Sequence, residues 1–362
     1  MVLAAGYSSR MNGFKPLLPL GGVPALEAAM RLFREAGLEE ILVVVGHRAE
    51  ELRPLVERAG ARAVLNPHFD QGMFTSVRAG AAALPATVAA CFVLPVDTPL
   101  VRPQTIRQMA AAFERGRILY PVFAGRRGHP PLVAADILRE AETSSGPLSA
   151  LLALHAKDAG DLAVADEAIH LDMDTAGDYA RLCDLAPGRA IPSVAECEAI
   201  LASVAVPEAR LAHSRAVAAL ALRVSSALAG HGTVLDRRLV NAGGLLHDLA
   251  KGRPHHAQAG AAHLRSLGFA RVAAIVEAHM DLDFSRGQLD EAALVFLADK
   301  LIRGTTPVSL EERFATALDR FRDDPAALAA ARRRLATAQS VAGAVEAKLG
   351  HPLAILVGDI DH

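Results

Sequence analysis

The first sixteen residues constrain the fold most tightly, because an apolar run is cut short there by a loop suited to bind an anion. The run Val2 to Ala5 ends at Gly6, and a hydroxyl-rich segment containing Arg10 and Lys15 follows it. Glycine lets the chain turn sharply, so that successive backbone N–H groups can converge on one anion, and the two basic side chains add positive charge. The pattern differs from the P-loop and from the dinucleotide-binding glycine fingerprint. It predicts a strand followed by a phosphate-binding loop of another kind.

The segment Leu3 to Lys15 resembles the opening signature of the MobA-like nucleotidyltransferases, which attach a nucleotide to molybdopterin. The resemblance implies that the loop wraps the triphosphate of an incoming nucleotide and that Arg10 and Lys15 neutralise it. Ala5 is typical of the cytidylyl-transferring branch, whereas glycine at this position is typical of the guanylyl-transferring branch. We therefore expect CTP as the nucleotide, with GTP as the alternative.

A second segment, Gln71 to Val77, resembles a helix N-terminus at which the same family contacts base and ribose. Without the resemblance it would be a plain helix cap. The nucleotide-binding residues expected from both segments are Leu3, Ala4, Ala5, Gly6, Ser8, Arg10, Lys15, Gly72 and Ser76.

Length and composition exclude several classes of protein. The 362 residues can form two well-packed cores. A formal net charge of −2 argues against a general nucleic-acid or membrane-surface protein, and no apolar run approaches the ~20 residues of a membrane span. Three cysteines without a CxxC pair suit a reducing cytosol better than a disulfide framework. We expect a cytoplasmic protein, whose natural start lies a few residues upstream because the first strand begins almost at Met1.

The first half alternates short apolar runs with longer helical patterns, which is typical of an α/β domain with a mostly parallel sheet. Strands are expected at 41–46, 63–65, 91–96, 118–123 and 169–173, and helices at 25–36, 48–59, 75–84 and 103–115. The segment 187–192 breaks this pattern, and the remainder is predicted to be all-α, with helices ending near Gly268 and at Gly304. We predict a transferase domain over residues 1–186, a linker over 187–192 and a helical domain over 193–362.

Asp97 lies at the C-terminal end of the expected strand 91–96, between two prolines. Ligands of open α/β sheets bind at such strand ends. A carboxylate there can hold Mg²⁺ against phosphate oxygens. Capping of the helix that follows Pro103 is the alternative, but the two-proline frame matches the metal-site strand end of the family and favours Mg²⁺.

Asp172 and Asp174 lie two residues apart at the end of the expected strand 169–173, so both would project from one face of it. The segment resembles the D-x-D-T segment of the same family, which implies that it closes the Mg²⁺ site opposite Asp97. Asp174 is the better ligand candidate, since one of the two could instead cap a helix beginning near Ala176.

Three residues of a turn, Gly128, His129 and Pro130, resemble the G-H-P turn that lines the acceptor pocket in the molybdopterin branch. The alternative is a simple lead-in to a strand, because a residue before proline is forced towards an extended backbone. A general base is not required, since the acceptor phosphate is already a nucleophile. Positioning, Mg²⁺ on Asp97 and the cations Arg10 and Lys15 would carry the transfer, with pyrophosphate as the leaving group.

Histidines and aspartates recur through the second half in an order suited to metal binding. The adjacent His247 and Asp248 interrupt an apolar helix that has no structural reason to carry two ionisable groups. Nitrogen and carboxylate ligands together suit a divalent transition metal. The order H…HD…D, formed by His213, His247, Asp248 and Asp299, resembles the HD superfamily of metal-dependent phosphohydrolases over roughly residues 211–304.

That resemblance implies that these four residues bind one divalent metal, such as Mn²⁺ or Fe²⁺, and that Asp248 bridges to a second. His256 and His279 match the additional ligands of two-metal members. Lys251 is placed to meet a substrate phosphate, or it is a solvated lysine at a helix end.

Together these patterns predict a bifunctional enzyme that transfers a nucleotide from CTP or GTP to molybdopterin and hydrolyses a nucleotide-like phosphoester of unknown identity. Molybdoenzyme maturation proteins are further expected partners, and the last helices are either scaffold or a homo-oligomer surface. The alternative is a sugar- or polyol-phosphate nucleotidyltransferase whose HD domain binds a nucleotide as a regulator.

Overall fold

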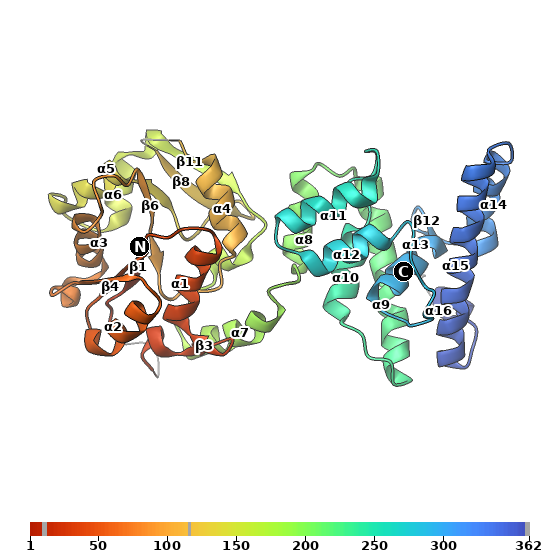
Figure 1. Ribbon diagram of the computed structural model, residues 1–362, viewed down its shortest axis with the longest axis horizontal. Helices are drawn as coiled ribbons and strands as arrows, with labels where there is room; N and C mark the ends of the chain where they lie inside the picture. Colours follow the sequence, from red (N-terminus) through yellow and green to blue (C-terminus); the bar gives the residue numbers. More distant parts are fainter. Residues whose placement is uncertain (9–12, 115–116, 359–362) are drawn as a thin grey trace. The chain divides into compact units, whose positions relative to one another are not determined.

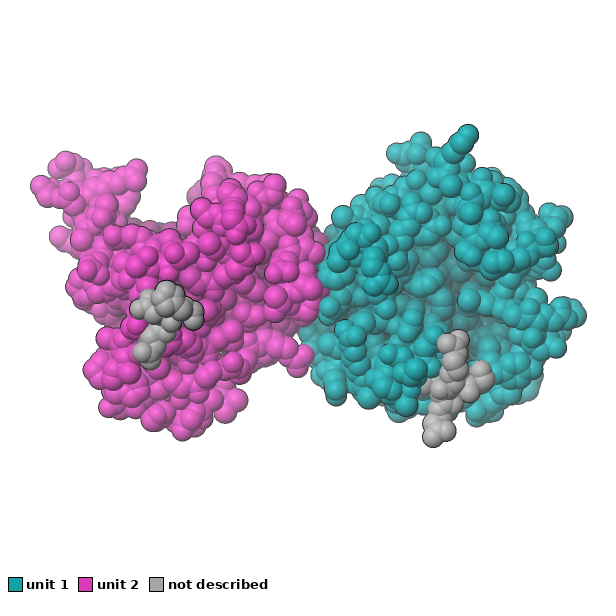
Figure 2. Space-filling view, turned by 180° about the vertical axis from the view of Figure 1, so that it is seen from behind, with its two compact units in different colours: residues 1–189 teal, residues 190–362 magenta. Residues whose placement is uncertain are grey.

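The computed structural model describes residues 1–8, 13–114 and 117–358. The chain separates into two compact units, Met1–Arg189 and Ala190–His362, which are coloured separately in Figure 2. Within the described ranges, each helix is too short or too polar to cross a lipid bilayer.

The first unit is built on two groups of strands joined by one continuous segment. Four parallel strands follow the order β5 (Arg62–Leu65), β4 (Leu42–Val45), β1 (Val2–Ala4) and β7 (Leu94–Pro95). The other group follows the order β6 (Ala90–Phe92), β10 (Leu132–Ala134), β8 (Ile118–Phe123) and β11 (Ala159–Ala163), in which β10 is antiparallel to both neighbours. Because β6 runs directly into β7, the expected strand 91–96 belongs to both groups.

The α-helices described in this unit, which Figure 1 shows around the strands, are α1 (Ala25–Glu35), α2 (Ala49–Arg58), α3 (Met73–Ala82), α4 (Pro103–Ala112), α5 (Ala135–Arg139), α6 (Leu148–Leu154) and α7 (Ala176–Leu185). α1 packs against α4, and α3 packs against α5. Two short hairpin arms complete the unit, with β2 (Pro19–Leu20) on β3 (Val23–Pro24) and β9 (Arg126–Arg127) on β8.

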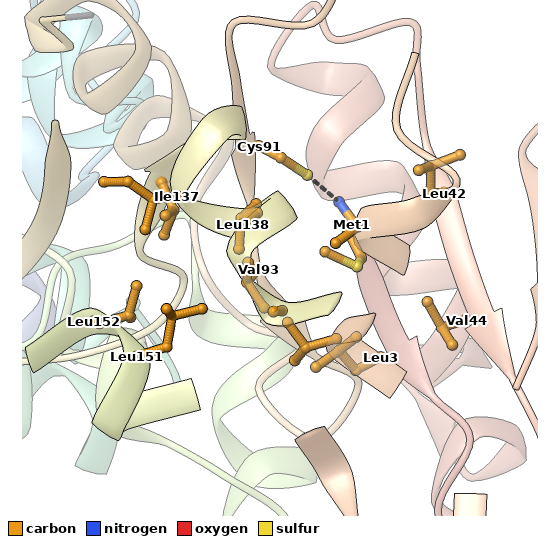
Figure 3. Close-up of a cluster of buried hydrophobic side chains, with 14 of the residues drawn as sticks. Met1, Leu3, Leu42, Val44, Cys91, Val93, Ile137, Leu138, Leu151 and Leu152 are labelled. Carbon is orange, nitrogen blue, oxygen red and sulfur yellow. Dashed lines mark hydrogen bonds between the residues drawn. The ribbon is translucent and has the colours of Figure 1, made fainter. Parts of the chain in front are cut away.

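Alternate residues of the strands build the core under α3, α5 and α6 (Figure 3). Leu3 and Leu42 lie on adjacent parallel strands and belong to the same buried cluster as Leu138 and Leu152 from the covering helices. Strand residues two apart share one face, which is why the apolar period of two directs them all to this core. The α/β class with a mainly parallel sheet is therefore confirmed.

The expected strand 169–173 is wrong. A 3₁₀ helix covers Glu167–His170, and the chain from Leu171 to Asp174 is irregular. The edge position beside β8 is taken by β11, whose composition is only weakly apolar. Ile169 is buried because the backbone of Gly128 lies against it, not because it pairs in a sheet. The alternation of apolar residues in this segment therefore comes from packing against the turn at Gly128 and does not indicate a strand.

The second unit is helical: α8 (Val194–Ser203), α9 (Glu208–Gly230), α10 (Arg237–Leu246), α11 (His256–Ser266), α12 (Ala270–Ala278), α13 (Glu291–Leu301), α14 (Leu310–Arg320), α15 (Pro325–Leu349) and α16 (Ala354–Gly358). α8 begins with a capping box in which Ser193 and Glu196 exchange hydrogen bonds. The helix expected to end at Gly304 ends at Leu301, since a small hairpin, β12 (Ile302–Arg303) and β13 (Thr306–Pro307), uses the glycine for its turn.

Glycine allows α10 to approach α9 closely. A Cβ placed on Gly244 would lie 2.6 Å from Cα of Ala218 in α9, and one on Gly243 would lie 2.8 Å from a methyl carbon of Ile275 in α12. α9 carries His213, and α10 leads directly into His247. Close helix packing therefore sets the separation of two predicted metal ligands.

Gly244→Ala is expected to destabilise this unit by about 1–3 kcal/mol, because the methyl group meets backbone atoms that cannot rotate away. Urea unfolding followed by circular dichroism measures the change. Gly230→Ala is the matched control, since a Cβ there has no neighbour within 4 Å. Alanine at that helix end should leave stability unchanged or raise it by up to about 1 kcal/mol. Equal stability of the two variants would contradict the packing argument.

Candidate active sites

A pocket of about 450 Å³ lies at the C-terminal ends of β1 and β7. Its wall includes eight of the residues expected to bind the nucleotide: Leu3, Ala4, Ala5, Gly6, Ser8, Lys15, Gly72 and Ser76. Asp97 and Asp174 also line it, while Arg10 lies outside the described residues. The structure thus brings together segments that are far apart in the sequence.

Lys15 connects the two carboxylates of the pocket. Its Nζ donates to Oδ1 of Asp174 at 2.8 Å and to Oδ2 of Asp97 at 3.2 Å, and its backbone N–H donates to Oγ of Ser8 at 3.0 Å. Burial of the ammonium group opposes its charge, but the hydrogen bonds and charges of Asp174 and Asp97 prevail and raise the pKa of Lys15. The two carboxylates therefore form one negatively charged site that binds a cation, here the ammonium group of Lys15.

The irregular segment after the 3₁₀ helix delivers Asp174 to this point. The N–H of Met173 donates to the carbonyl of Asp97 at 3.0 Å, which fastens the segment beside the end of β7. Thr175 caps α7 in a capping box with Asp178, so the alternative of a capping role for Asp172 or Asp174 is wrong. The capping alternative for Asp97 is wrong as well, because Arg102 occupies the N-cap position of α4.

Asp172 lies beside Asp97 and Asp174 but is exposed. Desolvation and the neighbouring carboxylates of Asp174 and Asp97 together raise the pKa of Asp172. The three carboxylates offer oxygen atoms as ligands, and oxygen is the ligand atom that Mg²⁺ requires. Asp97 and Asp174 fit such an ion better than Asp172, because both also line the pocket.

The start of α3 is held by a buried residue that sequence patterns missed. Asn66 is 1% exposed, and its amide group donates to Oγ1 of Thr75 at 2.8 Å and to Oγ of Ser76 at 3.0 Å. Gly72 adopts φ of 101°, which favours glycine, and turns the chain into the helix. Asn66 ends an ordinary strand pattern, so only its tertiary contacts reveal that it orders the pocket wall.

The turn Gly128–Pro130 lies against the segment that leads to Asp172. A Cβ on Gly128 would lie 2.5 Å from the carbonyl oxygen of Ile169, and the N–H of His129 donates to the same oxygen at 2.9 Å. Desolvation lowers the pKa of His129, while the charges of Asp97 and Asp172 oppose the change. These charges reach His129 because it stands beside the carboxylate cluster, outside the pocket wall.

The second candidate site, here called the HD cluster, gathers His213, His247, Asp248, His256, His279 and Asp299 from five helices and their ends. Asp248 stands between two sets of histidines. Its Oδ2 lies 3.9 Å from Nε2 of His213 and 3.5 Å from Nε2 of His247. Its Oδ1 lies 3.8 Å from Nε2 of His256 and 3.7 Å from Nε2 of His279. One carboxylate thus faces two groups of potential ligands.

Asp299 joins the first group, with Oδ1 at 3.2 Å from Nε2 of His213 and 3.6 Å from Nε2 of His247. Burial alone would lower the pKa of His247 and raise those of the two carboxyls. Their mutual contacts reverse both effects: the pKa of His247 rises to about 9, and the pKa values of Asp248 and Asp299 fall below the usual range. The cluster therefore stabilises positive charge between its carboxylates.

The orientation of the imidazole rings fits metal ions. Nδ1 of His213, His247 and His279 lies 2.9, 2.8 and 2.6 Å from the carbonyl oxygens of Gly304, Gly244 and Val276. When such a ring is neutral, as it is when a metal replaces the proton, Nδ1–H donates to the carbonyl and Nε2 is free to bind the metal, as in metal-binding histidines. Among the residues that the structure describes, the buried Nε2 atoms of His247, His256 and His279 have no hydrogen-bond partner. The donor set fits one or two divalent metals.

Two lysines are paired with the carboxylates of the HD cluster. Lys251 forms an ion pair with Oδ2 of Asp248, and Lys300 binds Oδ2 of Asp299 at 2.5 Å and the carbonyl of His279 at 3.0 Å. Lys251 therefore contacts the cluster although its side chain is half exposed. Lys300 is buried. Lys300 was missed because a lysine beside Asp299 resembles an ordinary surface pair.

Comparisons with known proteins divide the chain in two. Residues 1–163 match the family model described as MobA-like NTP transferase domain, and residues 210–304 match the model described as HD domain. The molybdenum cofactor cytidylyltransferase of Escherichia coli is 30% identical over 181 residues, which are 49% of this chain and 92% of that protein.

The nicotine blue oxidoreductase of Paenarthrobacter nicotinovorans is also 30% identical, over 193 residues that cover 50% of this chain and 94% of that protein. Other curated relatives are matched over only 24–31% of their own length. Among solved structures, a nucleotidyl transferase from Methanothermobacter is 26% identical, with a TM-score of 0.45 and coverage of 51% of this chain and 94% of that one.

Proposed function

Because the chain belongs to the MobA-like NTP transferase family and carries an HD domain, we propose that it transfers the cytidylyl group of CTP to a molybdopterin-type acceptor and hydrolyses a phosphoester at the HD cluster. An enzyme with a nucleotidyltransferase domain is established by the family; the nucleotide, the acceptor and the hydrolysis are the proposal. The name of the relative from Escherichia coli supports both the nucleotide and the acceptor.

The observation that carries the transferase proposal is the contact of Lys15 with Asp97 and Asp174 in the wall of the pocket. Asp97 and Asp174 would hold Mg²⁺, which when bound neutralises the phosphate oxygens of the nucleotide. The loop from Gly6 to Ser8 presents backbone N–H groups to the triphosphate, and Lys15 supplies positive charge. An acceptor phosphate oxygen then forms a bond to the α-phosphorus, the bond to the β-phosphate bridge breaks, and pyrophosphate leaves.

The HD cluster supports the second activity through its chemistry. His213, His247 and Asp299 would hold one divalent metal, and His256 and His279 a second, with Asp248 serving both. Metals bound there would polarise a phosphoryl group and acidify the attacking water. We propose Mn²⁺ or Fe²⁺, since imidazole nitrogen together with carboxylate oxygen suits these ions. Backbone carbonyls orient the rings of His213, His247 and His279, and the burial of these side chains keeps water away from them.

Pyrophosphate release tests the transferase proposal. The purified chain is incubated with Mg²⁺, molybdopterin and each of CTP, GTP, ATP and UTP in turn. The expected result is release with CTP above all others, and release above all with GTP would overturn the choice of nucleotide. A parallel screen of sugar and polyol phosphates as acceptors identifies the alternative: faster release with one of these than with molybdopterin would overturn the pterin acceptor.

A further inference from the structure

A second pocket, of about 550 Å³, opens beside the HD cluster and is strongly basic. Asp248, His256 and Asp299 reach its wall from the cluster. Four arginines, here called the arginine wall, line the rest of it together with Lys251 and Lys300: Arg303, Arg313, Arg320 and Arg334. Among the described lining residues, the acidic ones are the two cluster ligands Asp248 and Asp299. The pocket therefore carries an excess of positive charge directed at the cluster.

Most of the arginine wall comes from helices that lie beyond the residues matched by the HD model, which end at residue 304. Arg313 and Arg320 belong to α14 and Arg334 to α15. These helices pack on each other and on α13, the helix that carries Asp299. They therefore complete the pocket of the cluster rather than forming a separate body.

The arginines of α14 lie along one line. Arg313 and Arg320 are seven residues apart, which places them on one helix face about 10 Å apart along the axis. Arg313 lies at the cluster end, with its guanidinium 3.9 Å from Oδ1 of Asp299. Arg320 lies two turns further, with Ala317 between them in the same pocket wall. Positive charge thus extends from the cluster along the pocket for longer than one phosphate group.

Arg334 and Arg303 have closer partners than Arg313, whose guanidinium lies 3.9 Å from Asp299. Arg334 binds both carboxylate oxygens of Asp281, at 2.9 and 3.1 Å, and the carbonyl of Met280 at 3.0 Å. Arg303 donates to the carbonyl of Glu312 at 2.5 Å. Within the described part of the chain, the guanidinium of Arg313 has one ion-pair contact, the 3.9 Å approach to Asp299, although a guanidinium group has five N–H donors. Arg313 is therefore the side chain best placed to bind an anion between the cluster and α14.

We propose that the arginine wall selects substrates that carry at least two phosphoryl groups, one held at the HD cluster and the next held by Arg313 and Arg320. This inference rests on the hydrolase activity proposed above. In the reaction, the oxygen of a water forms a bond to the phosphorus at the cluster, and the bond from that phosphorus to the bridging oxygen breaks. One proton of the water goes to the released oxygen, so that phosphate and a product shorter by one phosphoryl group leave.

Binding to the metal-free full chain tests the wall without turnover. Isothermal titration compares inorganic pyrophosphate, CDP and orthophosphate, each added to the chain and to its Arg313→Gln and Arg320→Gln variants. Pyrophosphate binding by the N-terminal pocket is shared by all of these proteins, so their differences report the second pocket. Arg332→Gln is the matched control, since this arginine is exposed on α15 outside the pocket wall.

The expected result is that Arg313→Gln weakens diphosphate binding about ten-fold, or about 1.4 kcal/mol, and weakens orthophosphate binding less, because a single phosphoryl group contacts fewer of the arginines. A larger loss of affinity for CDP than for pyrophosphate in Arg313→Gln identifies a nucleotide as the source of the diphosphate, and an equal or larger loss for pyrophosphate identifies the inorganic ion. Unchanged diphosphate affinity in both pocket variants, with circular dichroism spectra like that of the parent, overturns the inference. Phosphate release by the metal-loaded chain is measured separately, and its absence with intact, Arg313-dependent binding overturns the proposed hydrolysis instead.

Discussion

Asp97→Asn is expected to lower the rate of pyrophosphate release about a hundred- to a thousand-fold, the size of effect seen when one stabilising group of a transition state is removed. The substitution keeps the shape of the side chain but removes the charge that Asp97 shares with Asp174 opposite Lys15. Two carboxylates then become one, which would weaken the proposed binding of Mg²⁺ beside the phosphates of the nucleotide.

Steady-state pyrophosphate release under saturating CTP, Mg²⁺ and molybdopterin measures the effect. Asp136→Asn is the control, because this aspartate of α5 is 94% exposed at its side chain and pairs only with Arg139 among the ion pairs of the described residues. Activity of the control should match that of the parent. If Asp97→Asn released pyrophosphate within a factor of three of the parent rate, Asp97 would have no part in the reaction.

Asp248→Ala is expected to have the second large effect, on metal content rather than on transfer. Loss of a residue that merely orients a metal ligand already weakens affinity about 10- to 100-fold, so loss of the carboxylate that faces both histidine groups should exceed about 100-fold. Elemental analysis after dialysis against a limiting concentration of Mn²⁺ should find metal on the parent chain and almost none on the variant. Phosphate release should disappear with it.

The same variant separates catalysis from regulation. Asp323→Asn, an exposed change in the same unit, serves as its control. Pyrophosphate release by the N-terminal site should be equal in Asp248→Ala, in the control and in the parent. A variant that kept its background phosphatase activity but altered the rate of nucleotide transfer would instead favour an HD domain that binds a nucleotide and regulates the transferase.

Much of the transferase pocket could be predicted because its parts are local in sequence. The loop at Gly6 and the strand end at Asp97 are each recognised within a few residues, and the alternation of strands and helices implies that such strand ends meet. The roles assigned to Arg10, Lys15 and the nucleotide-binding residues stay predictions, since geometry brings side chains together without showing what they bind.

The sequence-based predictions that failed, and the residues that they missed, all depend on tertiary contacts. The segment Ile169–Met173 has the composition of a strand, yet its burial comes from the close approach of Gly128, which no local pattern reports. Asn66 and Lys300 are ordinary residues until their partners are known. The arginine wall was missed because Arg313 and Arg320 on α14 look like a solvated face, and only the packing of α14 on α13 directs them to a pocket.

The sharing of Asp248 by two histidine groups has a consequence for how the cluster fills. Its two oxygens belong to one rigid plane, so a metal held by Asp248 and the group of His213 and His247 would also fix the direction in which Oδ1 faces His256 and His279. Such an ion would remove rotational freedom that a second ion would otherwise have to restrict. Loading should be cooperative, with a sigmoidal titration curve and few chains that hold a single ion.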